Sequence, residues 1–178
     1  MIRLDYLQKE DLSKIVEWNK DKSRDFLYQW SSYWYQYPIT EKQIEDRIMN
    51  KANMPGSDFY VYKVILEEAD EMIGTIELFN IDRISKTAFA GKFLIGDESQ
   101  WGRGLGKQIL KEVVRIGFDD IGLNTINLNV FDFNIGAIKC YESVGFIKKK
   151  LKEKVWESEN GFWNLYEMSI EREMFLHA

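Results

Sequence analysis

The stretch Glu98-Ser-Gln-Trp-Gly-Arg-Gly-Leu-Gly-Lys-Gln108 carries three glycines at alternate positions and runs directly into a helical pattern. Glycine tolerates positive φ and lets backbone N–H groups converge on one point, which favours an anion. Apolar residues recur at helical spacing over residues 105–119. The loop is therefore expected at a helix N-terminus, where unpaired amides attract phosphate.

Two better-known phosphate loops do not fit this stretch. In a Walker A loop, Trp101 would hold the place of the first glycine and Gln108 that of the hydroxyl residue. In a dinucleotide fingerprint, the third glycine would fall on Lys107 or on Ile109. A plain glycine-rich turn before a helix remains the alternative.

A second motif lies in Val130-Phe-Asp-Phe-Asn-Ile-Gly-Ala-Ile-Lys-Cys-Tyr-Glu-Ser-Val-Gly-Phe146. On a helix, Asn134 and Tyr141 fall on one stripe with Ala137 between them, because seven residues make almost two turns. Asn134 is expected to cap this helix and Gly145 to end it. A half-buried core tyrosine and a purely capping asparagine are the alternatives.

The two stretches resemble the signatures of the GNAT N-acetyltransferases. Residues 101–106 resemble the acetyl-CoA pyrophosphate loop Gln/Arg-x-x-Gly-x-Gly/Ala, from which Trp101 departs, and residues 134–146 fill every position of Asn-x-x-Ala-x-x-x-Tyr-x-x-x-Gly-Phe. The similarity is to the branch of ribosomal-protein alanine and spermidine acetyltransferases. It implies acetyl-CoA as cosubstrate, bound by Phe93, Leu94, Ile95, Trp101, Gly102, Arg103, Gly104, Leu105, Gly106, Lys107 and Asn134.

The resemblance also implies the chemistry. Tyr141 would protonate the leaving thiolate, and residues 93–95 would pair with the pantetheine amides like an added strand, with Gly91 marking a bulge. Glu77, on an otherwise apolar strand face, is the candidate base, and an ion-paired or exposed glutamate is its alternative. No activated nucleophile is evident, so transfer to the amine is expected to be direct.

The sequence predicts secondary-structure elements in the order β-α-α-β-β-β-α-β-α-β-β. Strands are predicted over residues 2–7, 58–66, 72–81, 86–95, 125–131, 146–156 and 162–170, and helices over 11–19, 41–51, 105–119 and 134–144. The fold class is α/β, a mixed and mostly antiparallel sheet of about seven strands, splayed between the fourth and fifth, with helices on both faces. Residues 1–178 would form a single GNAT domain.

Composition narrows the function further. With 24 basic and 29 acidic residues the net charge is -5, which argues against nucleic-acid binding and suits an amine acceptor, either a small molecule or a peptide N-terminus. Cys140 is the single cysteine and His177 the single histidine, so no metal site and no Ser-His-Asp arrangement is expected. No apolar run approaches a membrane span, and a cytoplasmic protein is expected.

Some interpretations remain open. The aromatic residues 26–37 would line the acceptor site, the core or a homodimer interface. The alternative functions are a catalytically silent CoA-binding module, against which Tyr141 argues, and a partner-binding domain, against which the glycine loop argues.

Overall fold

The computed structural model describes residues 1–175, which divide into two compact units. Unit 1 comprises Met1–Phe79 and Gly91–Leu105, and unit 2 comprises Asn80–Ala90 and the described residues from Gly106 onward. Strands β3 (Glu71–Asp82) and β4 (Thr87–Ile95) run through both units. The single domain over residues 1–178 stays a prediction, and His177 lies outside the described residues.

Within residues 1–175 the strands form a seven-stranded sheet in the order β1-β2-β3-β4-β5-β7-β6. Strands β4 and β5 pair in parallel, with residues 87–89 against 125–127, and the β1–β2, β2–β3, β5–β7 and β6–β7 pairs are antiparallel. The predicted mixed and mostly antiparallel sheet is confirmed. The other strands are β1 (Ile2–Tyr6), β2 (Tyr60–Leu66), β5 (Thr125–Phe131), β6 (Ile147–Ser158) and β7 (Gly161–Glu171).

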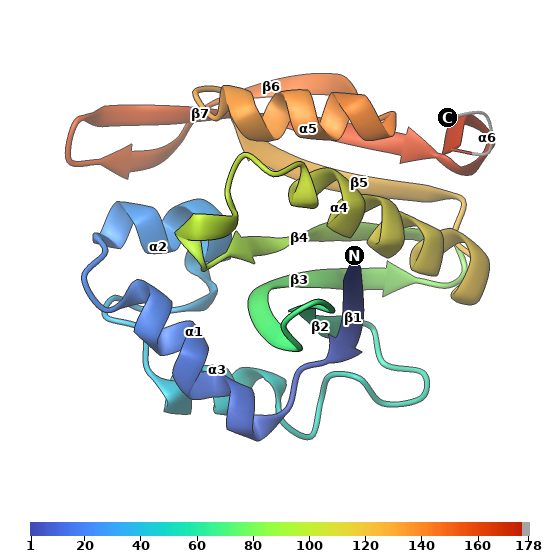
Figure 1. Ribbon diagram of the computed structural model, residues 1–178. Coiled ribbons are helices and arrows are strands. Elements are labelled where there is room, and N and C mark those ends of the chain that lie inside the picture. The colour runs from blue at the N-terminus through green and yellow to red at the C-terminus, as the bar shows by residue number, and fades with distance from the viewer. Residues whose placement is uncertain (176–178) are drawn as a thin grey trace. The chain divides into compact units, whose positions relative to one another are not determined.

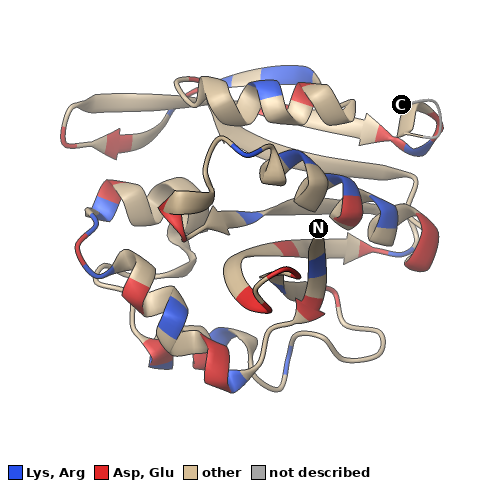
Figure 2. Ribbon diagram, in the orientation of Figure 1, with Lys and Arg blue, Asp and Glu red and all other residues tan. Residues whose placement is uncertain are grey.

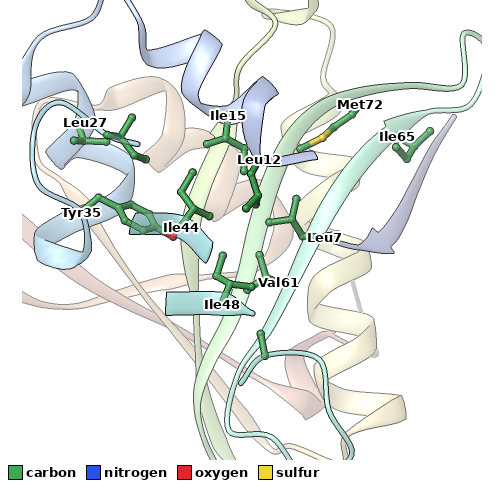
Figure 3. Packing of buried hydrophobic residues seen from close by; sticks show 12 residues of the cluster. Leu7, Leu12, Ile15, Leu27, Tyr35, Ile44, Ile48, Val61, Ile65 and Met72 are labelled. Carbon is green, nitrogen blue, oxygen red and sulfur yellow. The ribbon is translucent and has the colours of Figure 1, made fainter. Parts of the chain in front are cut away.

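Unit 1 contains three α-helices, α1 (Leu12–Asn19), α2 (Arg24–Ser31) and α3 (Glu41–Ile48), with the 3-10 turns η1 (Lys9–Asp11), η2 (Ser32–Trp34) and η3 (Glu98–Gln100). Helices α1 and α3 lie side by side (Figure 1). Their apolar faces and the buried side of β2 enclose one core, to which each α-helix contributes (Figure 3). Its members include Leu12, Ile15, Leu27, Ile44, Ile48, Val61 and Met72.

The sequence missed α2, because its aromatic residues show no clear helical period. The helix begins at a capping residue: the Ser23 hydroxyl accepts a hydrogen bond from the Phe26 amide. The buried residues Leu27, Tyr28 and Ser31 then recur at one helical face. Helix α3 also begins at a capping residue: the Thr40 hydroxyl accepts a hydrogen bond from the Gln43 amide, whereas the Gln43 side chain binds the backbone of Gln36 and Pro38.

Unit 2 carries α4 (Leu105–Arg115, whose first residue belongs to unit 1), the π-helical turn η4 (Ile116–Asp120), α5 (Ile135–Val144) and α6 (Arg172–Phe175). Strands β6 and β7 form a long hairpin (Figure 1). In it, Gly161 has φ +115°, as a tight turn requires. None of the helices within residues 1–175 is long and apolar enough to cross a membrane.

Strand β6 is an edge strand, and its first eight residues are all exposed. The basic run 148–154 lies here, visible as a blue stretch in Figure 2. Lys148 pairs with Glu142 and Lys152 with Glu167. These lysines form a solvated strand face, and such charges on an edge discourage pairing with other strands.

Candidate active site

The glycine loop, residues 101–106, has left-handed backbone at two of its glycines. Gly102 and Gly104 both adopt φ +75°, a conformation that side-chain-bearing residues rarely take. A Cβ on either glycine would have no heavy atom within 4 Å. The space beside both Cα atoms is therefore open, and these residues fit a diphosphate, which must approach backbone amides closely.

Trp101, the residue that departs from the loop signature, ties the loop to the end of β4. Trp101 is 52% exposed as a residue, and its indole N–H donates to the Ile95 carbonyl oxygen over 2.9 Å. The Ile95 carbonyl, which was expected to face pantetheine, thus already accepts one hydrogen bond. Arg103 is exposed and its guanidinium binds the Gln100 side chain next to the loop.

Lys107 connects the start of α4 with α5 inside unit 2. Leu105 is buried at the first position of α4, whereas Lys107 is exposed one half-turn later. The Lys107 charge acts on Cys140 of α5: burial raises the pKa of the Cys140 thiol, and Lys107 opposes that rise. The charge of Lys107 is therefore felt at Cys140, the residue before Tyr141.

Helix α5 has the termini that the second motif predicts. The Asn134 side chain accepts a hydrogen bond from the Ala137 amide over 3.2 Å, so Asn134 is the N-cap. Gly145 adopts φ +113° and its N–H bonds back to the last turn, which ends the helix. The capping role of Asn134 is confirmed, and its contact with a cofactor stays a prediction.

Tyr141 is a half-buried phenol on α5, tilted against the ring of Phe146 at 6.3 Å between centroids. Burial raises the pKa of Tyr141 well above its usual value, and the neighbouring Cys140 adds to that rise. Tyr141 is therefore protonated at neutral pH. Within residues 1–175 its hydroxyl makes no hydrogen bond, so the proton is not committed to another side chain.

The second half of β4 is placed by a close approach to β3. Leu94 is buried and Phe93 and Ile95 are partly exposed. A Cβ at Gly74 would lie 2.3 Å from the Leu94 carbonyl oxygen, so β3 can pass here only with glycine. The irregularity expected at Gly91 lies one residue later, because the positive φ, +45°, is at Lys92.

Glu77 is buried in β3 with both carboxylate oxygens engaged. Arg47 of α3 donates to them from Nη1 and Nη2, each over 2.6 Å, and also from Nη1 to the Tyr35 hydroxyl over 3.0 Å. The ammonium nitrogen of Lys92 lies 3.9 Å from Glu77 Oε2. We call these three side chains the Arg47–Glu77–Lys92 cluster. The ion-paired alternative for Glu77 is thus what the structure shows.

Neither Arg47 nor Lys92 was predicted from the sequence to belong to the site. Lys92 had a local signal, since it interrupts the buried apolar positions Ala88, Ala90 and Leu94 of β4. Arg47 had none, because an arginine in the last turn of a helix is commonplace. Its partner lies 30 residues away, a distance that no helical or strand period spans.

The aromatic segment divides between core and surface. Leu27 and Tyr35 belong to the unit 1 core and Trp30 packs against it, whereas Tyr33, Trp34 and Tyr37 are exposed. The Trp34 ring lies over cations of the chain itself, with its centroid 4.9 Å from Arg47 Cζ and 5.1 Å from Lys92 Nζ. Trp34 therefore makes its cation–π contacts with side chains of the chain itself, and a role of this segment at the acceptor site or a homodimer interface stays a prediction.

Comparisons with known proteins agree with these features. Residues 2–147 match the family model described as acetyltransferase (GNAT) domain. The probable N-acetyltransferase YjcK of Bacillus subtilis (strain 168) is 29% identical over 146 residues, 81% of this chain and 79% of YjcK. The spermidine N(1)-acetyltransferase of Vibrio cholerae is 26% identical over 119 residues, 66% of each chain.

Solved structures give the same result for the fold. The crystal structure of spermidine N-acetyltransferase from Vibrio cholerae in complex with CoA and spermine superposes with a TM-score of 0.83 at 19% identity, covering 98% of both chains. The fold and the two motifs define an acyltransferase that uses acetyl-CoA. The chain belongs to the GNAT acetyltransferase family, and it transfers acetyl from acetyl-CoA to an amine.

Proposed function

We propose that the glycine loop and α5 of this chain bind acetyl-CoA and that Tyr141 is the catalytic acid. The observation that supports this is the backbone of the loop, in which Gly102 and Gly104 both hold φ +75° with open space beside their Cα atoms, as the close approach of a diphosphate requires. Loop and phenol are far apart in sequence, and acetyl transfer needs both at one cosubstrate. We also propose that residues 1–178 act as a single domain.

The proposed binding residues fall into groups that would contact different parts of acetyl-CoA. The backbone of Gly102, Gly104 and Gly106 would hold the diphosphate, and Arg103 and Lys107 would neutralise it. Residues 93–95 would offer strand groups to the pantetheine amides, with Ile95 offering chiefly its N–H because Trp101 occupies its carbonyl. Leu105 is buried at the end of the loop, and Asn134 caps α5.

Acetyl-CoA supplies the thioester whose sulfur leaves as a thiolate. In our proposal Tyr141 holds its proton on Oη until that sulfur develops charge, and it stabilises the charge by donating the proton. The raised pKa of Tyr141 keeps this proton bound up to high pH. Cys140 has no role here, since burial raises the pKa of its thiol and disfavours a thiolate.

The proposed base would take the proton of the attacking amine. Glu77 stays a predicted base, and Arg47 would have to release one of its oxygens before it could take a proton. A Glu77 that only anchors Arg47 fits the same geometry. A base and an anchor differ in how their removal changes kcat, its pH dependence and the KM for the acceptor.

The acceptor is a primary amine of a small molecule or a peptide N-terminus in this proposal. Relatives act on such amines: one is named spermidine N(1)-acetyltransferase, and two are named aminoglycoside N(6')-acetyltransferase type 1. A homodimer and a cytoplasmic location stay predictions. A spermidine N-acetyltransferase of similar fold is described as dodecameric, which makes self-association worth measuring.

Thermal shift with CoA, followed by an assay for CoA thiol release with amines, tests the proposal. CoA should raise the Tm at saturating concentration, and Gly104→Ala should weaken the shift. Gly56→Ala is the matched control, because Gly56 also has a positive φ, +80°, and open space around its Cα. No shift in the wild type removes cofactor binding, and a shift without amine-dependent thiol release leaves a catalytically silent CoA-binding module.

A further inference from the structure

The Arg47–Glu77–Lys92 cluster is a buried site with an excess of positive charge. The side chains of Glu77 and Lys92 are each 4% exposed, and that of Arg47 is 13% exposed. Two cations face one anion, so the cluster carries one net positive charge. Among the described residues, the charges that act on Lys92 are those of Glu77 and Arg47.

The cluster also has hydrogen-bond donors that the chain leaves unused. Within residues 1–175, Arg47 Nε is buried and has no hydrogen-bond partner. The Lys92 ammonium has three N–H donors, and the nearest described anion, Glu77 Oε2, lies beyond hydrogen-bond distance at 3.9 Å. A buried donor without an acceptor is costly, so Arg47 Nε calls for an explanation.

The surroundings of these donors are aromatic on two sides. The Lys92 nitrogen lies 3.7 Å from the centroid of the Phe79 ring, and Trp34 lies over both cations. Trp34 itself is 55% exposed on the turn η2. The Trp34 ring therefore lies between the cluster and solvent. Arg47 and Lys92 already make the cation–π contacts that this ring offers.

A polyamine is a poor match for such a site. Its ammonium groups would meet like charge at Arg47 and Lys92, and would find Glu77 already bound to Arg47 through both oxygens. A carboxylate is a good match, because it brings the missing negative charge and oxygen acceptors for the free donors.

From this geometry we propose that Lys92 and Arg47 bind a carboxylate of the acceptor, so that the enzyme prefers amines that carry a carboxylate, such as amino acids or short peptides, over polyamines. This inference rests on the proposed function. It assigns Arg47 and Lys92 to specificity, with Trp34 packed over both cations and Glu77 holding Arg47 in place.

The test compares acceptors that differ in one group. A panel of amino acids and dipeptides is assayed for CoA thiol release, each beside its carboxamide and beside spermidine. The wild type should prefer each acid over its amide at least tenfold in kcat/KM. Lys92→Met keeps a side chain of similar length and removes its charge. It should abolish the preference by lowering kcat/KM for the acids while leaving kcat/KM for the amides unchanged. Lys63→Met is the control, because Lys63 is another ion-paired strand lysine, bound to Asp11.

Three outcomes would each overturn the inference while leaving acetyl transfer intact. They are equal rates for acids and amides, faster transfer to spermidine than to the acids, and an unchanged preference in Lys92→Met. A second measurement needs no turnover. N-acetylglycylglycine, but not its amide, should raise the Tm of the wild type and not that of Lys92→Met. If acid and amide act alike there, the inference fails whether or not any acceptor is turned over.

Discussion

The α5 motif and the Arg47–Glu77–Lys92 cluster are built in opposite ways. The motif is held by contacts a few residues apart, such as the cap from Asn134 to Ala137 and the Gly145 amide bonded to Glu142. The cluster joins a helix to two strands, and Arg47 lies 30 residues from Glu77. Contacts between residues close in sequence leave a recognisable pattern in the sequence. Contacts between residues far apart in sequence leave almost none.

The two regions also differ in charge. Tyr141 is a neutral phenol whose hydroxyl has no protein partner within residues 1–175, so folding does not depend on it. Glu77 is a buried anion in a bidentate pair, and folding depends on it strongly. Replacing the first residue should therefore change the rate of acetyl transfer, and replacing the second should change stability.

Tyr141→Phe should give the largest effect, a loss of about 10²–10⁴-fold in kcat, as expected when a positioned acid is removed. The Tm should stay within a few degrees of the wild type, because no hydrogen bond is lost and the ring still packs on Phe146. Steady-state kinetics and a thermal melt on the same sample measure both. A variant that works at the wild-type rate would show that Tyr141 is not the acid.

Glu77→Gln should lower the free energy of unfolding by about 3–5 kcal/mol, since it leaves Arg47 and Lys92 as uncompensated buried cations. Urea denaturation measures this. Glu71→Gln, on the same strand, breaks the exposed pair with Lys14 and should cost at most about 1 kcal/mol.

The kinetics of Glu77→Gln then separate anchor from base. At a temperature where the variant is folded, a base predicts a drop in kcat whose pH dependence differs from that of the wild type. An anchor predicts the wild-type pH profile and a raised KM for the acceptor. Equal stability of Glu77→Gln and Glu71→Gln would contradict the reading of Glu77 as a buried ion-pair partner.

The contrast explains what could be predicted from the sequence. The seven strands were found because β-branched and aromatic runs between turn residues are local signals, and α5 was found because its cap and its glycine end are local too. Helix α2 was missed, since its core face is Leu27, Tyr28 and Ser31 rather than an aliphatic stripe. Glu77 was noticed as an acid in apolar company, but its partners were not, because only the sheet and α3 together bring them to it.

Lys92→Met should raise the free energy of unfolding by about 1–3 kcal/mol at pH 7, because a buried cation is replaced by an apolar chain of similar length. Burial lowers the pKa of Lys92 to about 8 from the ordinary lysine value of 10.5. Between these values the unfolded chain binds more protons at this residue than the folded one, so the wild type gains stability as the pH rises.

The stabilisation by Lys92→Met should therefore be full below about pH 8 and shrink toward pH 10.5. Urea denaturation of both proteins over this pH range gives the difference directly. A pH-independent difference would mean that Lys92 titrates as an exposed lysine does. If Lys92→Met is more stable than the wild type and has lost the preference for acids over amides, the cluster serves binding at the expense of stability.

Asn134→Ala gives the smallest expected effect and tests the motif side of the comparison. Losing the cap should cost about 0.5–2 kcal/mol in unfolding free energy, because the Ala137 amide loses its acceptor. Asn134→Ser keeps a capping oxygen and should restore most of that stability. If CoA affinity falls in the alanine variant and returns with serine, Asn134 acts on the cofactor only by fixing the start of α5. If affinity stays low in the stable serine variant, the amide itself contacts the cofactor, and the cap and the contact are separate roles of one side chain.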